Sequence, residues 1–297
     1  MTGPMPTLSK AALCGLIAAA SLAPAAGAAE MREGGKLLLT DGVSTVEGSA
    51  GGGLATWAVI AGDETRDGIG GKLNASEVHL PAYDLRVYGA AVGFYNRVEI
   101  SYAREEFDTG STGAKLGIGD GFTFDQDVVG AKVRLVGDAV YDQDSWLPQI
   151  SAGLQYKQND KGALVKALGA KSADGVDYYV AATKVFLDQS LVVDATVRMT
   201  RANQIGILGF GGDRDANYSA QFEGSVGYLV TRHFVVGAEY RTKPNNLGVA
   251  REDDWSDLFA AYAVNSHLSI TAAYVDTGSI VTFANQRGLY LSLQAGF

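Results

Sequence analysis

The chain has 297 residues, a formal net charge of −9, 38 glycines and one cysteine, Cys14. The acidic balance excludes a nucleic-acid partner, which calls for basic patches, and a single cysteine excludes an internal disulfide. Beyond residue 30 no run of about 18 apolar residues predicts a transmembrane helix, and the length fits one large domain or two small ones.

Residues 1–29 have the pattern of a cleaved secretory signal peptide. Lys10 precedes the apolar run 11–23, and residues 26–28 (Ala-Gly-Ala) form a small-x-small cleavage signal. The apolar run is too short for a stable membrane anchor. We therefore expect an exported protein whose only cysteine is removed with the signal.

Residues 30–53 form a glycine-rich leader with a short hairpin. Asp41-Gly42 lies between LLLT and VSTV and predicts a two-residue turn. The arms of about four residues are too short to cross a bilayer. Two interpretations stand, namely a plug folded into the lumen of a barrel, or a periplasmic leader that pairs weakly with the base of that barrel.

From residue 54 to residue 297 the chain repeats segments of alternating polarity. In 218–228, for example, Phe222 and Val226 share one face, and Gln221 and Glu223 share the other. Many segments run about 9–11 residues, the length of a tilted strand that crosses a bilayer. About 12 strands are expected. They are 54–62, 83–95, 98–104, 128–137, 149–157, 176–186, 191–199, 218–228, 234–241, 258–264, 268–274 and 288–297.

The connections between these segments alternate in length. Short links at 96–97, 187–190, 230–233 and 265–267 are interleaved with longer polar ones at 63–76, 105–126, 158–175, 201–216, 242–254 and 276–287. Bacterial outer-membrane barrels have short periplasmic turns, longer extracellular loops and an even strand number. Residues 54–297 are therefore predicted to form an all-β, antiparallel transmembrane barrel, with a secreted soluble sandwich as a distant alternative.

The last segment, GLYLSLQAGF, places Leu289, Leu291, Leu293 and Phe297 on one face. This pattern resembles the C-terminal signal that the bacterial outer-membrane assembly machinery recognises. We expect that machinery, outer-membrane lipid and lipopolysaccharide as partners.

Two stretches and this last segment also resemble a protein family. EGGKLLLTDGVSTVEGSAGGGL (33–54), followed by Trp57, and RVEISYAREEFDTG (97–110) are similar to a family of uncharacterised proteobacterial proteins of about this length. The resemblance covers essentially all the mature chain. It implies an exported, barrel-forming protein of the outer membrane and supplies no catalytic or binding residues.

Charged side chains of both signs fall on the face that alternation assigns to the lumen. Such charges either line a wet pore or pair across the interior and fill it. The candidate lumen-lining residues are Glu99, Lys132, Arg134, Lys157, Asp194, Arg198, Glu223, Glu239, Arg241 and Asp257.

The favoured function is a passive channel for a small polar solute, with no cofactor and no metal. The alternative is a non-conducting barrel with a structural, adhesive or partner-binding role. An outer-membrane lipase ranks third, because His267 and Ser269 share a face and could pair a base with a nucleophile. Their position near the periplasmic rim, away from outer-leaflet lipid, argues against catalysis.

Overall fold

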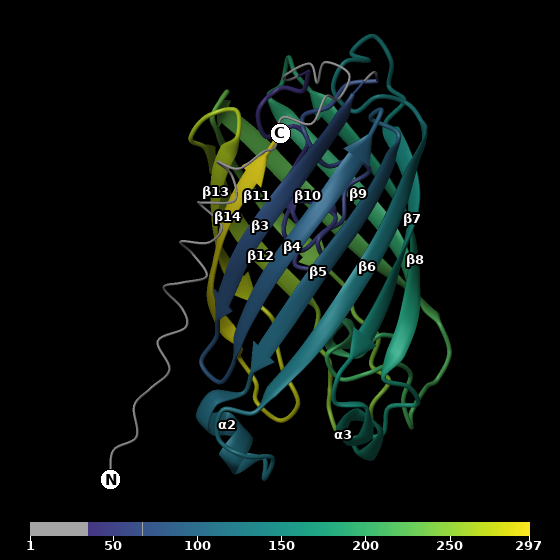
Figure 1. Cartoon of the computed structure of the whole chain (residues 1–297), viewed down its shortest axis with the longest axis vertical. Helices are drawn as coiled ribbons and strands as arrows, with labels where there is room; N and C mark the ends of the chain where they lie inside the picture. The colour runs from purple at the N-terminus through teal and green to yellow at the C-terminus, as the bar shows by residue number, and fades with distance from the viewer. Residues whose placement is uncertain (1–34, 67) are drawn as a thin grey trace, which may run out of the picture. The chain divides into compact units, whose positions relative to one another are not determined.

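The computed structural model describes residues 35–66 and 68–297, so the expected signal peptide lies outside the described residues. Within them, twelve antiparallel strands form one closed barrel, which confirms the predicted fold class (Figure 1). The ring closes where β14 pairs with β3. The barrel strands are β3 (Ile69–His79), β4 (Asp84–Phe94), β5 (Val98–Asp108), β6 (Thr123–Val136), β7 (Gln149–Asn159), β8 (Asp174–Phe186), β9 (Leu191–Thr200), β10 (Ser219–Thr231), β11 (Phe234–Arg241), β12 (Trp255–Ala263), β13 (Leu268–Asp276) and β14 (Arg287–Gly296).

The barrel wall is apolar outside and polar inside. On β10, Phe222 and Val226 are exposed, whereas Glu223 and Ser225 between them are buried. The same inversion runs along β9, where Val197 is exposed and Asp194 is buried. A soluble sandwich buries its apolar face instead. The wall is therefore that of a transmembrane barrel, whose outer face meets lipid.

The two ends of the barrel differ in the length of most of their connections, with 137–148 as a long exception at one end and 80–83 as a short exception at the other. One end, here called the short-turn end, carries the links 95–97, 137–148, 187–190, 232–233 and 264–267. The other, the long-loop end, carries 109–122 with α2 (Gly110–Lys115), 160–173 with α3 (Gly162–Ala167), 201–218 with η1 (Gln204–Gly206), 242–254 and 277–286; α2 and α3 mark it at the bottom of Figure 1. None of the helices in the described part of the chain is long and apolar enough to cross a membrane.

The expected first strand was wrong. Residues 54–62 lie fully buried inside the barrel, and the first wall strand is β3, which overlaps the range 63–76 expected as a loop. LATWAVIAG is apolar on both faces, which suits burial on all sides. β3 instead alternates buried Lys72, Asn74 and Ser76 with outward Leu73 and Ala75, as a wall between lumen and lipid requires. The barrel domain therefore begins at residue 69, and the link between β3 and β4 is only 80–83.

Residues 36–64, here called the plug, occupy the lumen, and their purple trace runs inside the ring of strands in Figure 1. Every residue from 39 to 62 is buried. The plug contains a two-stranded hairpin, β1 (Val43–Ser44) with β2 (Ala50–Gly51), which encloses residues 45–49. The hairpin expected at Asp41-Gly42 instead lies further along the chain, and the Asp41 carboxylate contacts the barrel residue Lys72 at 2.5 Å.

Candidate functional site

The lumen is filled in two layers of different chemistry. The polar layer consists of charged and polar wall side chains that hold the plug, and its members on β7, β9 and β11 (Lys157, Arg198 and Arg241) lie near the long-loop ends of these strands. The apolar layer lies against the long-loop ends of β3, β4, β5, β12, β13 and β14, with contributions from the loops. We take the plug and its contacts as the candidate functional site.

Glu47, in the plug hairpin, is the centre of the polar layer. Its carboxylate accepts two hydrogen bonds from Arg241, Nη1 to Oε2 at 2.8 Å and Nη2 to Oε1 at 3.0 Å. It is also paired with Lys157, and Arg198 Nη2 lies 3.5 Å from Oε2. Burial by itself would raise the pKa of Glu47, but Arg241, Lys157 and Arg198 together hold that pKa well below its usual range.

The cations around Glu47 are themselves tied to wall carboxylates. Arg198 Nε donates to Glu223 Oε1 at 2.5 Å, and Arg241 Nε lies 3.4 Å from the same oxygen. Asp177 Oδ2 lies 2.7 Å from Lys157 Nζ. The network therefore links β7, β8, β9, β10 and β11 through one residue of the plug, and such a network is costly to leave half-satisfied.

A second group of wall carboxylates accepts main-chain N–H groups of the plug. Glu239 accepts from Leu54 at 2.7 Å and from Ala55 at 3.3 Å. Glu223 accepts from Thr56 at 2.8 Å. The wall thus contacts the plug largely through its backbone.

Glu99 and Lys132 form a third contact with the plug. They are paired at 3.0 Å across β5 and β6. Glu99 accepts the N–H of Ala50 at 3.2 Å and of Ala61 at 2.9 Å, and Lys132 donates to the carbonyl of Val59 at 2.8 Å. Both charged groups are therefore satisfied by the pair and by the plug together.

The base of the plug is held at the short-turn end. Lys36 Nζ donates to the carbonyls of Ile60 at 2.6 Å and Gly62 at 2.7 Å, and lies 3.5 Å from Glu64 Oε1. Burial raises the pKa of Glu64 to about 8, and the Lys36 charge offsets only part of this rise. The main-chain oxygen of Phe297 accepts the N–H of Asp63 at 3.2 Å, which joins the plug to the last strand.

The structure places all ten predicted lumen-lining side chains inside the barrel, where each is buried. Those that contact the plug are Glu99, Lys132, Lys157, Arg198, Glu223, Glu239 and Arg241. Three do not. Arg134 pairs with Asp138 at 3.3 Å, Asp194 accepts from Thr183 at 2.6 Å, and Asp257 faces Glu239 in the register of β11 and β12.

Glu47 is the key residue that the sequence reasoning did not select. One signal was available, because Glu47 is the only charged residue between Asp41 and Asp63. A lone carboxylate in a segment bound for the lumen needs a cationic partner there. Its three cationic partners lie on strands that are distant in the sequence, so they cannot be identified from the plug segment alone.

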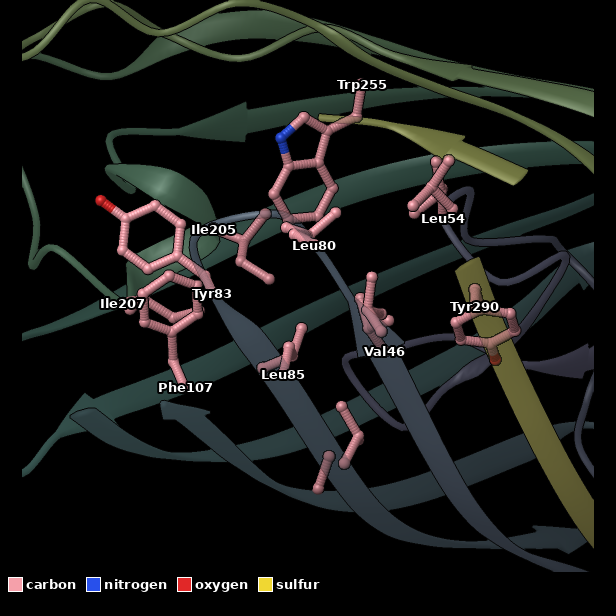
Figure 2. Close-up of a cluster of buried hydrophobic side chains, with 14 of the residues drawn as sticks. Val46, Leu54, Leu80, Tyr83, Leu85, Phe107, Ile205, Ile207, Trp255 and Tyr290 are labelled. Atoms are coloured by element: carbon pink, nitrogen blue, oxygen red, sulfur yellow. The ribbon is translucent and has the colours of Figure 1, made fainter. Parts of the chain in front are cut away.

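The apolar layer is a cluster of buried hydrophobic side chains inside the barrel (Figure 2). Leu85, Phe107 and Trp255 of the wall meet Ile207 of the loops and Val46 of the plug around a cavity of about 30 Å³. Tyr83 stacks on Phe107, with ring centroids 4.9 Å apart. The cavity is close to the volume of one water molecule, so this layer is packed.

Polar contacts tie the loops together above this layer. Glu252 accepts the N–H of Gln204 at 2.9 Å on both of its oxygens. Lys243 Nζ donates to Gln204 Oε1 at 2.7 Å and lies 4.7 Å from the centre of the Trp255 ring. Burial lowers the pKa of Lys243 to about 8, despite the nearby Glu252 carboxylate.

His267 and Ser269, the residues considered for a lipase, are not hydrogen-bonded to each other among the described residues. His267 Nδ1 lies 3.1 Å from the carbonyl oxygen of Gly296. Residues 35–66 and 68–297 also contain no group of three or more His, Cys, Asp or Glu side chains arranged to hold a metal.

The fold and the lumen define a class of protein, a transmembrane β-barrel whose lumen holds residues 36–64 of the same chain. Residues 40–294 match the model of the family described as "Protein of unknown function (DUF3034)", and the chain belongs to this family. No curated protein matches the sequence.

Solved structures similar to this chain are outer-membrane proteins. A KdgM porin in complex with disordered oligogalacturonate is 11% identical, with 76% of this chain and 99% of that chain covered and a TM-score of 0.48. A NanC porin is 10% identical, with 76% and 98% covered and a TM-score of 0.48. Outer membrane phospholipase A from Escherichia coli is 10% identical, with 76% and 91% covered and a TM-score of 0.42. At these values the fold assignment rests on the strand pairing of this chain itself.

Proposed function

We propose that this protein is a passive, non-enzymatic channel of the bacterial outer membrane that rests closed, with residues 36–64 as a displaceable plug. The short-turn end then faces the periplasm and the long-loop end faces outward, as in outer-membrane barrels generally. Cleavage of the signal peptide 1–29 delivers the chain to the periplasm, and outer-membrane lipid and lipopolysaccharide surround its outer face.

The observation that carries the proposal is the polar character of the contacts between plug and wall. The wall holds the plug through ion pairs to Glu47 and hydrogen bonds to main-chain groups. Water can replace such contacts once it enters the lumen, whereas an apolar core offers it no partners. The vacated wall would present charges of both signs, which suits a small polar solute.

The apolar layer favours a second candidate, a barrel that never conducts and serves a structural, adhesive or partner-binding role. The packed layer contains Phe107, Ile207 and Trp255, which are wall and loop residues that stay in place if the plug leaves, beside Val46 and Leu54 of the plug. Hydrophobic constrictions can also act as gates, so the two candidates differ in whether this layer opens.

The test is the conductance of a full-length protein whose plug does not seat. Gly48 has φ +86°, and a Cβ at this position would lie 2.8 Å from the Tyr102 carbonyl oxygen and 3.0 Å from Ala103 Cβ, both on β5. Gly48→Val is therefore both strained and obstructed. We expect steady single-channel current from Gly48→Val in a planar bilayer and a mostly closed wild-type protein.

Gly68→Ala is the matched control, because the nearest atom to its Cβ would be 3.7 Å away. It should behave as wild type. Protease access to residues 36–64 shows whether the plug has left the lumen. A folded, inserted Gly48→Val barrel with an accessible plug and no current would refute the channel and favour the non-conducting barrel.

A further inference from the structure

The wall binds the stretch of the plug from Leu54 to Ala58 through both the N–H and the C=O groups of alternate residues, and the Ala55 N–H also donates to Glu239 at 3.3 Å. The N–H groups of residues 54, 56 and 58 donate to Glu239, Glu223 and Thr183, at 2.7, 2.8 and 2.7 Å. The carbonyls of the same three residues accept hydrogen bonds from Arg241 at 3.3 Å, Thr196 at 2.7 Å and Gln149 at 2.6 Å.

These contacts depend little on the side chains of the stretch. Residues 55 and 58 are alanines, and Leu54 faces the apolar cavity. The hydrogen bond from Arg198 to the Thr56 hydroxyl, at 2.9 Å, is the polar side-chain contact between this stretch and the wall in the described part of the chain. Main-chain recognition of this kind accepts many sequences.

Two wall carboxylates, Glu239 and Asp257, lie side by side on the wall, and Glu239 contacts the first residue of this stretch, Leu54. Asp257 is the register partner of Glu239, and its side chain also points into the lumen. Asp257 is 7% exposed, and its Oδ1 has no hydrogen-bond partner in the described residues. Glu239 already accepts the N–H of Leu54, so a cationic group at the position of the Leu54 nitrogen would contact Glu239 beside its register partner Asp257.

We propose that the vacated lumen binds short peptides, with the main chain along the path of residues 54–58 and the terminal α-ammonium at Glu239 and Asp257. The plug then occupies the solute site of its own channel. This inference rests on the proposed function, since it names the class of solute. A peptide supplies both the N–H and the C=O groups that the wall loses with the plug, whereas a sugar supplies only hydroxyls.

The test measures binding to the full-length Gly48→Val protein in detergent, by titration calorimetry with pentaalanine. The comparison ligands are N-acetyl-pentaalanine, which lacks the ammonium, pentaalanine N-methylated at its third and fifth residues, and a neutral disaccharide. We expect pentaalanine to bind about tenfold or more tightly than each of them, as the loss of a charge-assisted hydrogen bond implies. Equal binding of all four ligands would overturn the inference.

Two further variants in the Gly48→Val background locate the site. Asp257→Asn should remove most of the preference for the free over the acetylated peptide. Glu105→Gln changes another buried wall carboxylate, one that is held by Gln126 at 2.9 Å, and should leave the preference intact. An equal loss in both would assign the preference to net lumen charge and refute the site.

Calorimetry and conductance separate the two proposals. Peptide binding without current would refute the channel and keep the binding site. Current that pentaalanine does not block, together with no calorimetric binding, would keep the channel and refute the peptide site.

Discussion

Glu47 and Arg241 lie 194 residues apart in the chain and meet inside the barrel as a two-point ion pair, with nitrogen–oxygen distances of 2.8 and 3.0 Å. A planar guanidinium facing both oxygens of one carboxylate sets orientation as well as distance. The pair therefore fixes the position of the plug hairpin against β11.

Glu47→Gln keeps the shape of the side chain and removes its charge. Arg241, Lys157 and Arg198 would then lack their shared counter-charge in a buried site. We expect the free energy of unfolding to fall by about 3 kcal/mol, measured by urea titration, and the fraction of time in the open state to rise in bilayers. Unchanged stability would show that Glu223 and Asp177 suffice to balance these cations.

Closure should weaken as the pH rises, because of Glu64. Burial raises the pKa of Glu64 to about 8 from its ordinary value of 4.5. Between pH 4.5 and about pH 8, the Glu64 carboxyl is protonated in the seated plug and ionised in the released plug. The contribution of Glu64 to the stability of the closed state is therefore complete below about pH 4.5 and is lost as the pH rises through about 8.

The measurement is the open fraction of wild-type channels from pH 5 to pH 9, beside Glu64→Gln. The wild type should open more often as the pH rises, and the variant should show a flatter profile. Identical profiles would assign the pH response to another group.

Glu252 should control the loops at the long-loop end. It accepts the N–H of Gln204 on both oxygens, so Glu252→Gln removes a charge-assisted contact between two loops. We expect the amide of Gln204 to exchange its hydrogen about tenfold faster or more, from a local loss of about 1.5–3 kcal/mol. Arg251→Gln, whose side chain is 80% exposed, is the control and should leave this exchange unchanged.

Phe297 should matter for assembly. Phe297 is 53% exposed, and its main chain pairs with Gly71. Leu289 and Leu291 are also exposed, and Leu293 is half-buried. Phe297→Ala should lower the folded fraction in membranes severalfold, as read by heat-dependent mobility on gels.

Val264→Ala removes an exposed apolar side chain beside the short-turn end and is the control. It should assemble normally. Equal folded fractions for the two variants would mean that the terminal aromatic is not a recognition signal.

Alternation of polar and apolar residues predicts eleven of the twelve wall strands of this barrel, all except β3. Lipid on one side and lumen on the other impose a period of two on every spanning strand. The face on which a residue such as Phe222 or Glu223 lies can therefore be predicted from its own strand. The same rule assigned all ten charged side chains, including Asp257, to the interior. Alternation could not show what those charges meet, because it describes one strand at a time.

The residues that fill the lumen could be identified only from contacts within the folded barrel. The apolar pattern of residues 54–62 resembles that of a wall strand. In the fold this segment lies in the lumen, where Glu239 and Thr183 on other strands accept hydrogen bonds from its main-chain N–H groups. Glu47 likewise acquires its role from Lys157, Arg198 and Arg241, which lie more than 100 residues away. These contacts exist only after the strands close into a ring, because ring closure is what brings distant strands to a common interior.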